Sequence, residues 1–365
     1  MSSTAPRQEL NRQSAIPATP TLFLSPETVP DEIRQLTKCN LHTHLEGSVR
    51  PQTFVELAHE EGIALPVSPA DLPRMMQVTG EERNLVDYLA KIIFNYPILK
   101  NALALRRISR EAVEDAAHCN VRYFELRAGP VNHATPDLSV REVIAAILAG
   151  LEDAEAQYGV TCRLIISALR HHPPAVNIAL ARTALEFRGA GVVGFDIAGD
   201  ELQHPAALNK EAFDIAREGG LGITVHAGEA GGSEEVRYAL TELGATRIGH
   251  GVHSIQDPNT IALINERGAT LEICPTSNVH TNAVPSIHDH PVRQFIQAGV
   301  RVTIGDDDPI TSRTNLSREL ALLAQEFHFT IAELHALQLT GIESSFLEDA
   351  ARRKQLRQEF SRHQM

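Results

Sequence analysis

The sequence stretch VRYFEL (Val121–Leu126) is followed by VREVIAAILAGLEDAEAQY (Val140–Tyr158) and then by CRLIISA (Cys162–Ala168). The two outer stretches are short, rich in apolar residues and not strictly alternating, as is typical of strands covered on both faces. The middle stretch repeats its apolar residues with a period of 3.6, which predicts an amphipathic helix. A strand, a helix and a second strand in this order predict a parallel sheet with a crossover helix.

The same alternation runs along the chain from about residue 36. Further short apolar runs lie at Lys38–Leu41, Gly191–Ile197, Gly222–His226, Arg247–Gly249, Thr270–Ile273 and Val300–Ile304. Another helix start is indicated by Asp257 as a cap and Pro258 at the first helical position. Eight such strands fit a closed barrel better than an open sheet. We therefore predict an α/β fold, a (β/α)₈ TIM barrel.

The first connection of this barrel is far longer than the others. Helical spacing in it predicts helices at Pro51–Glu61, Leu85–Leu99 and Leu103–Cys119. Met75 and Met76 fall in a predicted loop between the first two. We expect a helical insertion after the first strand that covers the mouth of the barrel, and extra C-terminal helices in Thr330–His363.

The composition is that of a globular protein large enough to bury a substantial core. The chain has 365 residues, 43% of them hydrophobic, and a formal net charge of −13. An acidic protein of this kind is a poor partner for nucleic acid or for an anionic membrane. It also contains no run of the roughly 20 apolar residues that a membrane span needs. Its four cysteines lack the paired spacing of a disulfide framework or a cysteine zinc site.

The first residues differ in composition from the rest. Residues 1–35 begin with a segment rich in Ser, Thr, Pro and Gln that lacks the basic start and apolar centre of a secretory signal. We interpret them as a flexible leader before a single cytoplasmic barrel domain, residues 36–365.

Polar residues follow the predicted strands where each strand ends. They are His42, His44, Arg170, His171, Asp196, Asp200, His226, Glu229, His250 and the run Asp306–Asp308. The carboxyl ends of barrel strands meet at one face, which is where chemistry occurs in this fold. We therefore expect histidines and carboxylates from distant parts of the chain to gather around one mouth.

Four of these residues form a candidate metal site. His42 and His44 are two apart on a strand, so both imidazoles face the same side. His226 is a third candidate ligand and Asp307 a fourth, because crowded carboxylates need a cation or a raised pKa. Three imidazoles and a carboxylate suit Zn²⁺, with one position left for water. The fourth predicted strand contains no Lys to bridge a second metal, so we predict one Zn²⁺ per chain.

Two further residues are candidates for proton chemistry. Glu229 lies three residues after His226 and is a candidate for moving protons without binding the metal. His250, between two glycines, is a candidate for holding a zinc-activated hydroxide, with a structural role as the alternative. His288 and His290 precede a helix rather than end a strand, and we interpret them as surface or capping residues.

Together these segments resemble the adenosine/adenine deaminase family, zinc-dependent purine deaminases of the amidohydrolase superfamily. The matching segments, in the family's order, are NLHTHLEGS (Asn40–Ser48), GFDIAGDE (Gly194–Glu201), VHAGE (Val225–Glu229), RIGHG (Arg247–Gly251), EICPTSNVHT (Glu272–Thr281) and TIGDDDP (Thr303–Pro309). The resemblance implies hydrolytic deamination of adenosine and 2′-deoxyadenosine to inosine and ammonia, by attack of zinc-activated hydroxide at purine C6.

The resemblance also implies roles for single residues. His42, His44, His226 and Asp307 look like the zinc ligands, and His44 also lies in the substrate site. Glu229 looks like the proton shuttle to purine N1, and His250 like the residue that orients the hydroxide. Asp308 is expected to contact N7, and the backbone of Gly199 to contact N3.

Two departures from the family pattern concern the substrate. Glu46 stands where the adenosine enzymes usually have an Asp that binds the ribose 5′-hydroxyl, which favours adenine or a 5′-modified nucleoside such as 6-aminodeoxyfutalosine. The segment from Pro275 to Thr281 instead resembles the nucleoside enzymes. Asp306 is an additional carboxylate beside the expected metal. A barrel that binds a purine or a metal without turnover is the non-enzyme alternative, but the complete set of ligands and acid disfavours it.

Overall fold

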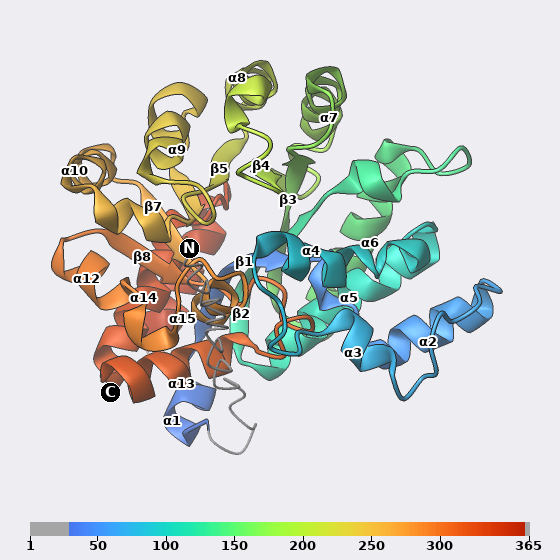
Figure 1. Ribbon diagram of the computed structural model, residues 1–365, viewed down its shortest axis with the longest axis horizontal. Helices are drawn as coiled ribbons and strands as arrows, with labels where there is room; N and C mark the ends of the chain where they lie inside the picture. Colours follow the sequence, from blue (N-terminus) through green and yellow to red (C-terminus); the bar gives the residue numbers. More distant parts are fainter. Residues whose placement is uncertain (1–28, 362–365) are drawn as a thin grey trace, which may run out of the picture.

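The computed structural model of the chain describes residues 29–361, and in them eight strands form one sheet in the order β1 to β8. The strands are β1 (Lys38–His44), β2 (Val121–Ala128), β3 (Thr161–Leu169), β4 (Val192–Ala198), β5 (Gly222–Ala227), β6 (Arg247–His250), β7 (Thr270–Ile273) and β8 (Arg301–Ile304). All neighbouring pairs are parallel. The predicted TIM barrel is confirmed, and Figure 1 shows its helices fanned around the strands.

The ring closes between β1 and the segment that follows β8. The amide of His44 donates to the carbonyl of Asp307 at 2.7 Å, and the amide of Asp307 donates to the carbonyl of His42 at 2.9 Å. The two histidines of β1 and Asp307 are therefore fixed to one another by the same backbone bonds that complete the barrel.

The helices match the predicted alternation. They are α1 (Asp31–Gln35), α2 (Pro51–Glu60), α3 (Leu72–Met76), α4 (Leu85–Ile93), α5 (Ala102–His118), α6 (Val140–Tyr158), α7 (Pro174–Glu186), α8 (Lys210–Glu218), α9 (Ser233–Tyr238), α10 (Pro258–Arg267), α11 (Pro275–His280), α12 (Val292–Gln297), α13 (Leu316–Phe327), α14 (Ile331–Ser344) and α15 (Ala350–Ser361). Helix α6 has its predicted bounds because Ser139 and Glu142 form a capping box at its start. Asp257 caps α10, as predicted.

The insertion after β1 carries α2, α3, α4 and α5, and two details of its prediction are wrong. Met75 and Met76 belong to the short helix α3 instead of a loop, and the side chain of Met76 is fully buried. The helix predicted over Leu85–Leu99 ends at Ile93, and a 3₁₀ turn follows at Tyr96–Ile98. Pro97 explains the break, because a proline has no N–H to donate to the carbonyl four residues earlier, that of Ile93, and its ring would clash with that carbonyl.

The two ends of the described chain pack on the barrel. Asp31–Gln35, within the range predicted as a leader, form α1, which contacts α13 and buries Ile33. Residues 1–28 of the predicted leader lie outside the described residues, so their flexibility stays a prediction. The predicted C-terminal helices are α14, which packs on β1 and β8, and α15, which packs on α14. No helix in residues 29–361 is long and apolar enough to cross a membrane.

The interior of the barrel holds charged side chains where the sequence predicted apolar strands. Arg247 pairs with Glu125 at 2.7 Å and with Glu272 at 2.6 Å. Arg127 pairs with the other oxygen of Glu272 and with Asp196 at 3.1 Å. Buried charges are tolerated when each is paired in this way. These paired acidic and basic side chains form a continuous series from the barrel centre to its mouth.

Candidate active site

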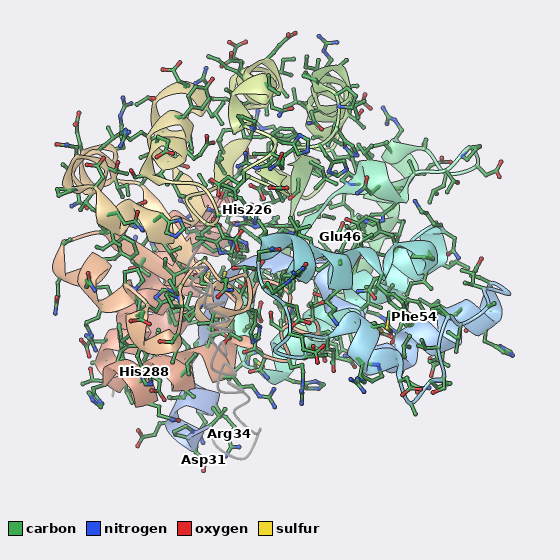
Figure 2. All side chains as sticks on the ribbon, in the orientation of Figure 1. Asp31, Arg34, Glu46, Phe54, His226 and His288 are labelled. Carbon is green, nitrogen blue, oxygen red and sulfur yellow. The ribbon has the colours of Figure 1, made fainter. Side chains whose placement is uncertain are left out.

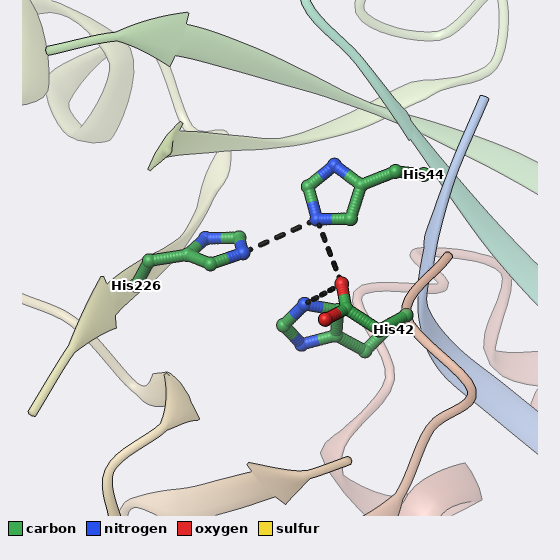
Figure 3. A group of neighbouring side chains, drawn as sticks. His42, His44 and His226 are labelled. Carbon is green, nitrogen blue, oxygen red and sulfur yellow. Dashed lines mark hydrogen bonds and ion pairs between the residues drawn. The ribbon is translucent and has the colours of Figure 1, made fainter. Parts of the chain in front are cut away.

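Three histidines from two strands meet at the mouth of the barrel. His42 and His44 come from β1 and His226 from β5, and Figure 3 shows their rings turned toward one another. The Nε2 atoms of His44 and His226 are 3.2 Å apart. Oδ1 of Asp307 lies 3.3 Å from Nε2 of His42 and 3.4 Å from Nε2 of His44. The four residues predicted as metal ligands are thus brought together.

Carboxylates behind two of the rings fix which nitrogen carries the proton. Nδ1 of His42 lies 3.0 Å from Glu272, and Nδ1 of His226 lies 3.0 Å from Asp196. An ionised carboxylate only accepts, so each Nδ1 donates and each Nε2 turns a lone pair inward. Burial opposes ionisation of Glu272, but Arg127 and Arg247 lower the pKa of its carboxyl well below the ordinary value. The buried ion pairs therefore keep the carboxylates ionised, and the carboxylates orient the histidine rings for metal binding.

This donor set fits a single divalent cation. The four ligand atoms all lie within 4.8 Å of one another. Nε2 of His226 turns its lone pair toward Nε2 of His44, and burial lowers the pKa of His44 to about 3, which keeps its ring neutral and able to bind a cation. Three imidazoles and one carboxylate are a donor set that zinc binds, and metal-binding histidines usually have a carboxylate at the other ring nitrogen, as His42 and His226 do here.

The loop after β5 places Glu229 next to these ligands. The carboxylate of Glu201 accepts the backbone N–H groups of the four consecutive residues 228–231, at 2.7–3.1 Å. Glu229 is buried, and burial together with Asp307 and Glu201 raises the pKa of its carboxyl well above the ordinary value. The loop therefore holds a carboxyl group with a raised pKa, and one of its oxygens lies 3.6 Å from Nε2 of His250.

His250 reaches the site from the end of β6. Its ring is buried, and its Nδ1 lies 3.0 Å from Nδ2 of Asn278. Its backbone has φ = 63°, a left-handed conformation that is uncommon outside glycine. His250, Glu229 and Asp307 thus surround one small volume, as the sequence predicts.

The interpretation of His288 and His290 is half right. His288 lies at the periphery, with its side chain 75% exposed and paired with Glu326 (Figure 2). His290 does cap α12, because its Nδ1 accepts the N–H of Val292 at 3.1 Å. It is however not at the surface: only 2% of it is exposed, and its Nε2 lies 3.1 Å from Oδ1 of Asn278.

The run of three aspartates divides into different roles. Asp306 accepts hydrogen bonds from Asn40 at 2.7 Å and from Thr43 at 2.5 Å, so it braces β1 and is not among the four ligand atoms. Asp308 instead faces the cavity, and its Oδ2 accepts the hydroxyl of Tyr88 at 3.1 Å. Burial and the neighbouring Asp307 raise the pKa of Asp308 well above the ordinary value.

A cavity of about 340 Å³ opens from these groups toward solvent. One wall is apolar and comes from the insertion: Leu85, Tyr88, Leu89, Ile92 and Ile93 of α4, with Tyr96. Helix α4 therefore covers the mouth, as predicted. Gly199 and Glu46 also line the cavity. One carboxylate oxygen of Glu46 accepts the N–H of Gly129 at 2.8 Å and lies 2.7 Å from Nε2 of the buried His133.

Sequence reasoning missed the residues that support the site. Glu272, Glu201, Asn278, His133 and Tyr88 each contact a predicted site residue, and none was given a role. Glu272 had a signal, because it is a charged residue inside a strand of four. Asn278 and His133 lie in helical turns whose approach to the site depends on tertiary packing.

Comparison with known proteins agrees with this geometry. The adenosine deaminase family profile matches residues 37–362. An adenosine deaminase of Clostridium perfringens is 36% identical over 87% of this chain and 96% of its own. The crystal structure of an adenine deaminase from Arthrobacter aurescens superposes with a TM-score of 0.83 at 26% identity, covering 90% of this chain and 98% of its own. An amidohydrolase from Burkholderia ambifaria with bound zinc has a TM-score of 0.83 at 29% identity, covering 95% and 97%.

Proposed function

The chain belongs to the adenosine deaminase family, and we propose that it hydrolyses adenosine and 2′-deoxyadenosine at purine C6. The reaction consumes one water and releases ammonia and inosine or 2′-deoxyinosine. The observation that carries this proposal is the convergence of four metal-ligand atoms, Glu229 and His250 on one cavity. A metal-binding barrel without turnover would not need the last two groups.

We place one Zn²⁺ among His42, His44, His226 and Asp307. When bound there, zinc would supply hydroxide at neutral pH, because it lowers the pKa of a coordinated water to about 7. Asp196 and Glu272 hold His226 and His42 in the tautomer that binds metal. The number of one ion rests on the single cluster of four ligands; the other candidate group in the described residues shares Asp307 with it.

The remaining steps fall to Glu229 and His250. The carboxyl of Glu229 donates its proton to purine N1, which makes C6 more electrophilic. His250 orients the attacking oxygen. The new C6 hydroxyl then passes its proton through the Glu229 carboxylate to the amino group, which leaves as ammonia while C6 becomes a carbonyl, and the proton released when the water ionises restores that of Glu229. The four backbone hydrogen bonds that Glu201 accepts from residues 228–231 support this assignment, because they fix the backbone at Glu229 rather than leaving the acid on an unrestrained loop.

Two groups on the opposite side of the cavity would hold the purine ring. Asp308, in its protonated form, donates to N7, and Tyr88 fixes the orientation of its carboxyl group. The backbone of Gly199 contacts N3. Gly199 has φ = 109°, a conformation that residues with a side chain rarely adopt, and it lines the cavity.

Adenine and 5′-modified adenine nucleosides, such as 6-aminodeoxyfutalosine, are the alternative substrates. Glu46 favours them, because its side chain is one methylene longer than the usual Asp. Its bonds to Gly129 and His133 fix one carboxylate oxygen at the rim. We retain the nucleosides as the leading substrates because a fixed carboxylate is also a suitable acceptor for a ribose hydroxyl.

Ammonia release tests this function. The zinc-loaded protein is given adenosine, 2′-deoxyadenosine, adenine and a 5′-extended adenine nucleoside side by side. We expect the first two to be preferred; preference for adenine or the extended nucleoside would make Glu46 the determinant of another specificity. Bound zinc with no ammonia from any of the four would favour a binding protein. Glu46→Asp is the matched variant: an unchanged order of substrates would remove Glu46 from the argument.

A further inference from the structure

The ring of His250 lies at the end of a buried chain of hydrogen bonds whose other members do not line the cavity. The N–H of Val292 donates to Nδ1 of His290 at 3.1 Å. Nε2 of His290 lies 3.1 Å from Oδ1 of Asn278, and Nδ2 of Asn278 lies 3.0 Å from Nδ1 of His250. His250, Asn278 and His290 are each at most 2% exposed.

The direction of every bond in this chain follows from its first member. A backbone N–H can only donate, so Nδ1 of His290 carries no proton and its ring proton is on Nε2. That N–H must face an acceptor, which identifies the near atom of the Asn278 amide as its oxygen. The amide NH₂ then faces His250, so Nδ1 of His250 accepts. A neutral His250 consequently carries its proton on Nε2.

We propose that Asn278 and His290 are positioning residues that fix the tautomer of His250, with its Nε2–H directed at the reacting atoms. This inference rests on the proposed deaminase function for its catalytic meaning. Nε2 is the nitrogen that faces Glu229 at 3.6 Å and Asp307 at 4.0 Å. In this state His250 donates a hydrogen bond to the attacking oxygen and does not act as a base there.

The surroundings of His290 support a neutral ring. Burial lowers the pKa of His290 to about 3, and Phe327 packs edge-on at 6.4 Å between ring centroids. A protonated His290 would also turn an N–H against the N–H of Val292. The donor and the acceptor in each of these hydrogen bonds therefore keep their roles at neutral pH.

Nuclear magnetic resonance tests the tautomer directly. The zinc-loaded full chain is labelled with ¹⁵N-histidine, and the His250 signals are identified by their loss in His250→Gln. We expect an unprotonated Nδ1 and a protonated Nε2, which differ strongly in ¹⁵N chemical shift. Asn278→Asp keeps the shape of the side chain but presents only acceptors to His250, so Nδ1 should become protonated. An Nδ1 proton in the unaltered protein, or no change in the Asp variant, would overturn the proposal.

Kinetics test whether this tautomer matters. We expect Asn278→Asp to lower kcat by about 10²-fold, the order that loss of one positioned hydrogen-bond donor to the reacting oxygen costs, with unchanged KM and zinc content. Full kcat in this variant with the proton moved to Nδ1 would refute a catalytic meaning.

His290 offers a matched pair of variants should Asn278→Asp fold poorly. His290→Gln keeps an N–H donor toward Asn278 and should retain kcat and the His250 tautomer. His290→Leu removes the donor and lets the amide turn, so kcat should fall about twofold, because the two orientations of the amide then become about equally populated once the hydrogen bond is lost. Equal activity of the two variants would overturn the role of His290. Absence of ammonia release from the unaltered protein would instead refute the proposed function, while the tautomer could still be measured.

Discussion

Glu201 holds the loop that carries Glu229 through hydrogen bonds to the backbone of residues 228–231. The effect of replacing Glu201 by glutamine can therefore be calculated in advance. One carboxylate oxygen of Glu201 accepts the N–H of Gly228, and the other oxygen accepts the N–H groups of the three residues that follow. In Glu201→Gln one oxygen becomes NH₂. The amide will turn so that its remaining oxygen keeps the three bonds, and its NH₂ will then face the N–H of Gly228, a donor against a donor.

The size of the effect follows from this change. A hydrogen bond to a charged group contributes about 1.5–3 kcal/mol, and the three retained bonds also lose their charge assistance. We expect the free energy of unfolding to fall by about 2–4 kcal/mol. With an unfolding entropy of about 0.8 kcal/mol per degree for a chain of this length, Tm falls by about 3–5 °C. Displacement of the Glu229 backbone should lower kcat by about 10- to 100-fold.

Calorimetry and ammonia release from adenosine measure the two effects. Glu319→Gln is the control, because Glu319 is also a buried glutamate but accepts from Thr276 and Thr314 away from the loop. It should leave kcat unchanged. If Glu201→Gln kept both Tm and kcat, the four backbone bonds would have no part in holding the acid, and the reasoning would be refuted.

Three further outcomes are expected. Glu229→Gln should keep its zinc and lose turnover by about 10²- to 10⁴-fold, since its amide cannot transfer the proton; loss of zinc, by metal analysis, would place Glu229 among the ligands. Asp307→Ala should lower zinc content, and unchanged content would move the fourth ligand to Asp306 or Asp308. Burial raises the pKa of Glu319 to about 7, above an unfolded value of about 4.5, so the folded state binds its proton more tightly and loses stability as pH rises from 4.5 to 7. Glu319→Gln should therefore be more stable in urea at pH 8 by about 3 kcal/mol, with the difference vanishing below about pH 4; equal stability at pH 8 would contradict the raised pKa.

The barrel and the groups that touch the reaction could be predicted from the sequence because both depend on local pattern. Short apolar runs identify strands, and the residue that follows a strand lies at the mouth whatever the packing of the helices. His42, His226 and Asp307 therefore meet as expected. Only the details governed by single residues differ, such as the break that Pro97 makes after α4.

The supporting groups could not be predicted because their contacts depend on tertiary packing. Asn278 reaches His250 only through the turn after β7, and His290 looks like a surface residue until α12 is packed beside Phe327. Glu272 and Arg127 are far apart in the sequence and become partners inside the barrel. For such residues the sequence shows the chemical type of the side chain but does not show which residues it contacts.

The most direct measurement is ammonia release from adenosine during titration of the metal-free protein with zinc. We expect no release before zinc is added and a rate that rises in proportion to bound zinc and stops rising at one ion per chain. Zinc binding without ammonia release at any ratio would contradict the deaminase function, and a rate that kept rising to two ions would contradict the single-metal site.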